Sequence, residues 1–130
     1  MIIVDTSAWI AAMRQPDGAA AATLRSLIDV DEACLALPVR LELLAGVAAK
    51  DRTALRRGLT ALPVVVPTEE TWKLVESWVV PAAEAGHRFA VTDLLIAGMA
   101  HELGGLVWSL DTDFARLEKL GFVQRYNPPA

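Results

Sequence analysis

The sequence predicts an α/β protein with three layers, αβα, whose central sheet is short, mainly parallel and built of about four or five strands. Two observations lead to this fold class. Short apolar runs alternate with stretches of helical periodicity along the 130 residues, as they do in βαβ units. The first run, Ile2–Val4, is β-branched and uninterrupted, which suits a strand buried on both faces of a parallel sheet. Residues 1–130 are predicted to form a single domain.

The first half of the chain is predicted to hold two strands and four helices. In order, these are a strand at 2–4, a helix at 8–13, a helix at 19–29, a strand at 33–37, a helix at 38–46 and a helix with Leu55, Leu59 and Leu62 on its apolar stripe. Thr6 or Ser7 is expected to cap the first helix and Asp17 the second, because their side-chain oxygens can accept from free N–H groups. The helix at 38–46 is expected to turn three residues inward, namely Leu41, Leu44 and Ala45.

The second half is predicted to hold three strands and three helices. In order, these are an edge strand at 64–66, a long helix after Thr68, a buried helix ending at Gly104 and Gly105, a strand at 106–110, a helix with Phe114, Leu117 and Leu120 inward, and a strand at 121–124. Thr68 and Thr92 are the expected N-caps, and Pro81 is expected to kink or end the long helix. That helix is expected to bury Trp72, Val75, Val79 and Ala82, with Trp78 near the border. Residues 126–130 are expected to form a loose tail.

Composition limits the function classes. Apolar residues make up 54% of the chain, so we expect part of the surface to be covered by a second copy or another protein. The net charge of −4 counts against a protein that coats RNA non-specifically, but not against a nuclease whose acidic site holds a metal. The single cysteine, Cys34, is expected to be buried in a protein of a reducing compartment. Because signal-peptide and transmembrane patterns are missing, we expect a cytoplasmic protein.

Acidic side chains follow two predicted strands and begin one predicted helix. Asp5 comes directly after the first strand, Asp111 ends the strand at 106–110, and Asp93 lies in the first turn of the buried helix. The carboxyl ends of parallel strands share one edge of a sheet, where ligands bind in such folds. Glu42 should lean toward the same edge, because helical side chains tilt toward the N-terminus. We therefore expect these four carboxylates to meet, with Asp113 close by.

Carboxylates that lie this close together repel one another, and a bound cation would offset the repulsion. Two unit charges about 4 Å apart repel by roughly 4 kcal/mol at an effective dielectric of about 20. The motifs that carry the carboxylates contain no His or Lys to offset this repulsion. Ligands made only of oxygen favour Mg²⁺ or Mn²⁺ over zinc. Such an ion activates water and shields the anionic transition state of a phosphodiester, so the residues indicate phosphoryl chemistry.

Four segments of the chain resemble the four motifs of PIN-domain ribonucleases. They are IVDTSAWI, RLELLAG around Glu42, TDLLIAGMA and SLDTDF. The resemblance is to the small, single-domain, VapC-type toxins of bacterial toxin–antitoxin pairs. Each motif alone is weak, since a DTS tripeptide is common by chance. All four in the right order within 130 residues are specific, and the resemblance covers essentially the whole chain.

The resemblance implies a Mg²⁺- or Mn²⁺-dependent endoribonuclease that cuts tRNA, rRNA or mRNA. Asp5, Glu42, Asp93 and Asp111 match the catalytic acidic quartet that binds the metal in this family. Further residues match supporting positions of the motifs, namely Thr6, Ser7, Ser109 and Asp113.

The resemblance also implies two protein partners. One is a cognate antitoxin, which in this family often places an Arg in the acidic pocket. The other is a second copy of the chain, in a homodimer that can belong to a larger toxin–antitoxin assembly. The chain departs from the family pattern in two places. Ser109 stands where Thr is commoner, and Leu37 with Pro38 replaces a frequent polar residue ahead of Glu42.

The only basic cluster of the sequence is a candidate contact for RNA phosphates or for an acidic partner, or else a solvated helix face. Its members are Lys50, Arg52, Arg56 and Arg57.

Two other folds place Asp at strand ends. Haloacid-dehalogenase-type phosphatases need a second Asp where this chain has Ser7, and receiver domains need an acidic pair and a late Lys. Within the PIN-like fold, a non-catalytic module that binds RNA or protein and a housekeeping RNA-processing nuclease remain alternatives.

Overall fold

A parallel sheet lies at the centre of residues 1–129, the part of the chain that the computed structural model describes. In chain order, the elements of these residues are β1 (Ile2–Val4), α1 (Thr6–Arg14), α2 (Ala19–Asp29), β2 (Ala33–Ala36), α3 (Leu37–Gly46), α4 (Ala49–Thr60), β3 (Val64–Val65), α5 (Glu69–Glu84), α6 (Val91–Leu103), β4 (Leu106–Trp108) and α7 (Asp113–Lys119). The four strands of this part of the chain lie in the order β3-β2-β1-β4, and each pairing is parallel. The predicted α/β class with a parallel sheet is confirmed.

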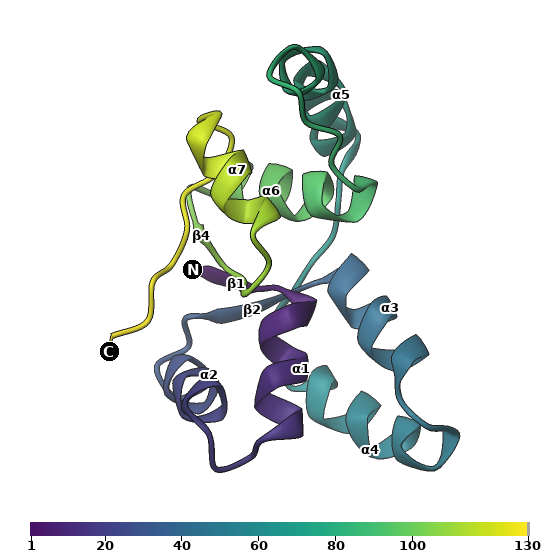
Figure 1. Ribbon diagram of the computed structural model, residues 1–130. Helices are drawn as coiled ribbons and strands as arrows, with labels where there is room; N and C mark the ends of the chain where they lie inside the picture. Colours follow the sequence, from purple (N-terminus) through teal and green to yellow (C-terminus); the bar gives the residue numbers. More distant parts are fainter. Residues whose placement is uncertain (130) are drawn as a thin grey trace.

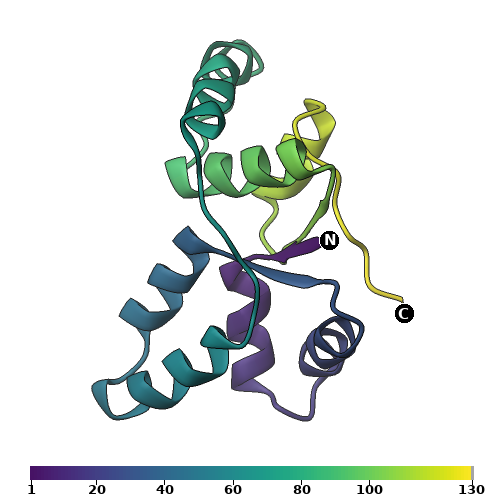
Figure 2. The ribbon, with the colours of Figure 1, turned by 180° about the vertical axis from the view of Figure 1, so that it is seen from behind.

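The chain adds strands to both sides of β1, with β2 and β3 on one side and β4 on the other. This strand pairs with β2 on one side and with β4 on the other. Figure 1 shows α1 and α2 on one side of the strands and α5, α6 and α7 on the other, and Figure 2 shows the same two groups from behind. Loops that leave neighbouring strands toward opposite faces of a parallel sheet open a crevice beyond the carboxyl ends of those strands. In this chain the rule points to the edge of the sheet beyond β1 and β4.

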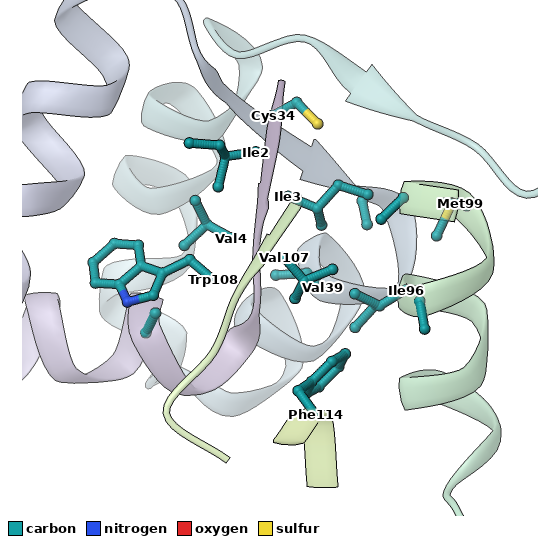
Figure 3. Packing of buried hydrophobic residues seen from close by; sticks show 14 of the residues in the cluster. Ile2, Ile3, Val4, Cys34, Val39, Ile96, Met99, Val107, Trp108 and Phe114 are labelled. Carbon is teal, nitrogen blue, oxygen red and sulfur yellow. The ribbon is translucent and has the colours of Figure 1, made fainter. Parts of the chain in front are cut away.

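Both faces of the sheet contribute to the core. All three residues of β1 are buried, and the buried hydrophobic residues form one cluster. Figure 3 shows Ile3 on the side of α6, which carries Ile96 and Met99, while Trp108 lies on the other face. Cys34 is also buried in this cluster, as predicted, and its burial raises the pKa of the thiol to about 11. The period-2 alternation of the strands therefore anchors helices on both faces.

Asp5, and not Thr6 or Ser7, is the N-cap of α1. The helix begins at Thr6, and the Asp5 carboxylate accepts a hydrogen bond from the Ser7 N–H. The carboxylate comes directly after β1 and therefore reaches the free N–H groups one residue earlier than predicted. The end of the first strand and the start of the first helix are thereby joined through one acidic side chain.

Two other predicted caps are also wrong. Gly18 precedes α2 where Asp17 was expected, and Ala90 precedes α6 where Thr92 was expected. In both cases extended backbone leads into the helix, so the residue type alone did not mark the first turn. Asp93 nevertheless lies in the first turn of α6, as predicted. At α5 the prediction is confirmed, because Thr68 is the N-cap and forms a capping box.

Two helices bury a face that agrees only in part with the predicted one, and in α5 Val75 and Ala82 are buried as predicted. The buried residues are Val39 and Leu43 in α3, and Thr71, Val75, Trp78 and Ala82 in α5. Four residues expected inside are exposed, namely Leu41, Ala45, Trp72 and Val79. In α5 the Trp78 ring stacks on Phe122, with ring centroids 4.4 Å apart, so a contact with a distant segment decides which side faces inward. Pro81 does not end α5, which continues to Glu84.

The predicted strand at 121–124 is wrong, because these residues form no strand and only Arg125, directly after them, makes a single parallel bridge with Val107. The Tyr126 N–H donates to the Val107 carbonyl oxygen at 2.8 Å, and the Tyr126 ring contacts Trp108 edge to face. Tyr126 is thus held on β4 and does not belong to a loose tail. For the rest of 126–130 the loose tail stays a prediction, and Ala130 lies outside the described residues. Across residues 1–129, no helix combines the length and apolar character that a membrane span requires.

Candidate metal centre

The carboxylates predicted to meet lie beyond the carboxyl ends of β1 and β4. Asp5 follows β1 directly, and Asp111 lies in the loop between β4 and α7. Asp93 lies in the first turn of α6, and Asp113 begins α7. Glu42 projects from α3. We call these five side chains the acidic cluster.

Asp5 is the most deeply held member, with only 5% of its surface exposed. Its Oδ2 accepts hydrogen bonds from Ser7 Oγ at 2.8 Å and from Ser109 Oγ at 2.7 Å. The two hydroxyl oxygens in turn accept from the backbone, Ser7 Oγ from the Leu110 N–H and Ser109 Oγ from the Asp111 N–H, each at 3.0 Å. One network therefore joins the end of β1 to the loop that carries Asp111.

Asp93, Asp111 and Asp113 form the tightest group of the acidic cluster. One carboxylate oxygen from each lies within 4.8 Å of the other two. The Asp113 N–H also donates to Asp111 Oδ1 at 2.9 Å, which fixes these two residues relative to one another. The sequence predicted Asp113 only in the neighbourhood, whereas the structure places one of its carboxylate oxygens within 4.8 Å of those of Asp93 and Asp111.

The raised pKa of Asp93 indicates that all five carboxylates belong to one electrostatic site. The pKa of Asp93 is raised to about 7, first by burial of the carboxyl group and then by the negative charges of Asp5, Asp111, Asp113 and Glu42. Each of these four groups disfavours ionisation of Asp93. The repulsion expected from the sequence is therefore present in the folded chain.

Glu42 lies on the rim of the acidic cluster. Its side chain is exposed, and its Oε1 accepts a hydrogen bond from Thr6 Oγ1 at 3.1 Å. This contact brings α3 to the start of α1, in the direction that the N-terminal tilt of helical side chains predicts. Next to Glu42, a largely apolar groove of about 400 Å³ opens between α1, α3 and α4. Ile10, Leu43 and Leu55 are among its apolar lining residues.

Within residues 1–129, no ion pair joins the basic cluster of α4 to the acidic cluster. Figures 1 and 2 show α4 on the same side of the strands as α1, and α7 on the other side. Lys50, Arg56 and Arg57 are exposed. Arg52 has a structural contact instead, since its guanidinium donates to the carbonyl oxygens of Leu44 and Val47 after the last turn of α3. A role of these four residues in binding RNA or a partner stays a prediction.

One cationic neighbour of the acidic cluster escaped the sequence prediction. Arg116 Nη1 donates to Asp113 Oδ1 at 2.7 Å. The signal that could have found it is the i,i+3 spacing of Asp113 and Arg116 on one helix, which brings oppositely charged side chains together. That spacing is common on exposed helices and became meaningful only when Asp113 proved to group with Asp93 and Asp111.

The acidic cluster fits a hard divalent cation. Its donors are carboxylate oxygens, which is the ligand type that Mg²⁺ and Mn²⁺ prefer. Three of these oxygens already lie within 4.8 Å of one another. The pKa of Asp93 is raised first by burial and then by the repulsion of the other carboxylates, and a cation among the carboxylates would offset that repulsion.

Comparisons with known proteins agree with the fold and with the motif assignment. The model of the PIN domain family matches residues 2–120. A VapC ribonuclease of Mycobacterium bovis is 29% identical over 129 residues, which cover 95% of this chain and 96% of the relative.

Two solved structures of complexes show the same fold. The crystal structure of VapBC2 from Rickettsia felis bound to a promoter DNA fragment matches with a TM-score of 0.78 and 16% identity, over 99% of this chain and 100% of the other. A toxin–antitoxin complex from Klebsiella pneumoniae matches with a TM-score of 0.68 and 15% identity, over 88% of this chain and 91% of the other. At these identities the likeness is one of fold.

Proposed function

Since this chain belongs to the PIN domain family, we propose that it is a metal-dependent endoribonuclease and the toxin of a toxin–antitoxin pair. One observation carries the proposal. Five carboxylates from separate parts of the chain share one site, where four of them help to raise the pKa of the fifth, Asp93, to about 7. A module that only binds RNA or protein gains nothing from this repulsion, whereas a hard cation makes use of it.

We propose Mg²⁺ or Mn²⁺ as the cofactor, with Asp5, Glu42, Asp93 and Asp111 as the residues that would hold it. When bound, an ion of this kind stabilises negative charge on a phosphate and lowers the pKa of a coordinated water. The half-buried Asp93 must lose its proton before it can serve as a ligand, because metal binding requires the carboxylate form. Metal affinity should therefore increase as the pH rises through about 7.

The residues around the carboxylates serve to hold them in place. Ser7 and Ser109 donate to the same oxygen of Asp5, and Thr6 donates to Glu42. These bonds restrict the rotation of the carboxylates before RNA arrives, so less reorganisation is needed at the reacting phosphate. Thr6, Ser7 and Ser109 are therefore proposed as positioning residues.

The proposed partners are an RNA substrate, a cognate antitoxin and a second copy of the chain. The relative named a VapC ribonuclease and the toxin–antitoxin complex of the same fold support the first two. The apolar groove beside Glu42 offers a docking place for an apolar segment of the antitoxin, with the acidic cluster next to it to receive a guanidinium. A homodimer, a single domain over residues 1–130 and a cytoplasmic location complete the proposal.

The test compares wild type, Asp5→Asn and Asp17→Asn on total bacterial RNA, with Mg²⁺ or Mn²⁺ and with EDTA. We expect cutting by wild type only when metal is present. Asp5→Asn should be inactive because it removes the negative charge of a proposed metal ligand. The Asn side chain keeps nearly the same size and shape as that of Asp. Asp17 lies exposed in the loop before α2, so Asp17→Asn is the matched control and should cut like wild type.

Equal cutting in every lane would refute the proposed mechanism. RNA that is retained in a gel shift but stays intact under all conditions would identify the non-catalytic binding module instead. Sequencing of RNA ends after induced expression separates the remaining alternatives. A toxin should produce new ends in cells whose growth stops, while a housekeeping nuclease should process RNA in growing cells.

A further inference from the structure

Arg116 is placed at the acidic cluster by a chain of short contacts. The Asp111 N–H donates to Ser109 Oγ, the Asp113 N–H donates to Asp111 Oδ1 at 2.9 Å, and Arg116 Nη1 donates to Asp113 Oδ1 at 2.7 Å. Each link is local in the chain. These contacts place the guanidinium beside the carboxylates of Asp111 and Asp113.

Fold stability does not account for this ion pair. The side chains of Arg116 and Asp113 are 51% and 35% exposed, and exposed pairs of this kind contribute about 0 to 1 kcal/mol. Within residues 1–129, the Arg116 guanidinium makes a single hydrogen bond, which Nη1 donates to Asp113. Most of its five N–H donors thus remain free to bind something else.

Arg116 also stands apart by its charge. Among residues 1–129 it is the only Lys or Arg side chain that forms an ion pair with a member of the acidic cluster. The basic residues that the sequence suggested for RNA contact lie on α4, on the other side of the strands from α7 (Figure 1). A phosphodiester bound at the carboxylates of Asp111 and Asp113 would therefore lie within reach of the Arg116 guanidinium.

We propose that Arg116 binds a phosphate of the RNA backbone next to the acidic cluster, and that Asp113 holds the guanidinium in position for this contact. The planar fork of a guanidinium matches two phosphate oxygens, and such charge-assisted hydrogen bonds are stronger than neutral ones. The inference rests on the proposed function, because it takes RNA as the substrate. It names the residue that binds the RNA phosphate at that same site.

The experiment uses Arg116→Gln, Arg116→Lys and Lys119→Gln. Lys119 is exposed on the same helix, so Lys119→Gln removes the same charge at a different place. The substrate is a labelled RNA oligonucleotide taken from a site that the wild type cuts in total RNA. Initial rates at saturating Mn²⁺ give kcat and KM at several salt concentrations. Calorimetric titration with Mn²⁺ alone gives the metal affinity without RNA.

Arg116→Gln should raise KM about tenfold or more, as expected for the loss of hydrogen bonds to a charged group, and leave kcat nearly unchanged. The dependence of log KM on log salt should become shallower by about one phosphate contact. Arg116→Lys should fall between wild type and Arg116→Gln, because it keeps the charge and loses the fork. Mn²⁺ should bind Arg116→Gln as tightly as wild type or more tightly, since a positive charge has left the site.

Two results would overturn the assignment of Arg116 alone. One is the same KM in Arg116→Gln and Lys119→Gln. The other is weaker Mn²⁺ binding in Arg116→Gln with activity restored by more Mn²⁺, which would show that Arg116 only orients Asp113 for the metal. A wild type that cuts no RNA in any metal would instead overturn the proposed function, and the Arg116 inference with it.

Discussion

At the scale of single residues, Asp93 is a carboxyl group whose surroundings disfavour its ionised form. Its pKa is raised from 3.8 to about 7, mainly by burial and then by the neighbouring carboxylates. A carboxyl group with a raised pKa binds more protons in the folded than in the unfolded chain between these two pH values. The free energy of unfolding therefore falls as the pH rises through this window, and the loss is complete above about 7.

The first prediction follows from this sign. In EDTA, Asp93→Asn should melt at the same temperature as wild type or higher near neutral pH. With Mg²⁺ or Mn²⁺ present, Asp93→Asn should cleave no RNA. The advantage of Asp93→Asn should grow between pH 4 and pH 7 and then level off, because only the wild type loses a proton there. Thermal unfolding followed by circular dichroism over this range measures the difference.

Asp17→Asn, the same chemical change in an exposed loop, should show no such pH-dependent difference from wild type. If Asp93→Asn instead lost much stability without metal, Asp93 would be stabilising the start of α6, and the electrostatic account of this residue would be wrong.

At the scale of elements, the packing of α5 on α6 positions Asp93. The two helices meet at Gly98, where an added Cβ would lie 2.7 Å from Val75 Cγ1 and 3.4 Å from Thr71 Cγ2. Val75 is buried and β-branched, so it has little freedom to move aside. The absence of a side chain at Gly98 thus allows α5 to approach α6 closely enough to bury Thr71 and Val75.

The second prediction compares two Gly→Ala changes in helices. Gly98→Ala should lower the free energy of unfolding by about 1 to 2 kcal/mol, because overpacking outweighs the gain in helix propensity. Gly58→Ala in α4 should raise it by about 0.5 to 1 kcal/mol, since an added Cβ there has no atom within 4 Å in the rest of residues 1–129. Urea denaturation gives both values. A stabilised Gly98→Ala would mean that α5 and α6 are farther apart than described.

At the scale of the whole molecule, only the folded chain can assemble the acidic cluster. Its members come from the junction of β1 and α1, from α3, from α6, from the β4–α7 loop and from the start of α7, and they are scattered over the length of the chain. An unfolded chain does not hold these oxygens together. A cation that binds the cluster therefore stabilises the folded state by mass action.

The third prediction is a metal-dependent rise in melting temperature. Mn²⁺ or Mg²⁺ at about 100 times its dissociation constant should add about 2.7 kcal/mol to the free energy of unfolding. Asp111→Asn should lose most of this gain, and Asp17→Asn should keep it. Differential scanning calorimetry at increasing metal concentrations provides the measurement. Equal shifts in Asp111→Asn and wild type would place the metal somewhere other than the acidic cluster.

The sequence by itself determined the class of fold, the buried strand that Asp5 follows, the buried helix with Asp93 in its first turn, and the convergence of the carboxylates. These features follow from local patterns, because a β-branched apolar run and a buried helix specify their own geometry and parallel strands share one carboxyl edge. Only the tertiary structure decided that Trp78 faces inward and Trp72 outward, that Asp113 groups with Asp93 and Asp111, and that Arg116 pairs with Asp113. Helical periodicity leaves the buried side of α5 and the partners of an exposed ion pair undetermined, since both depend on segments distant in the chain.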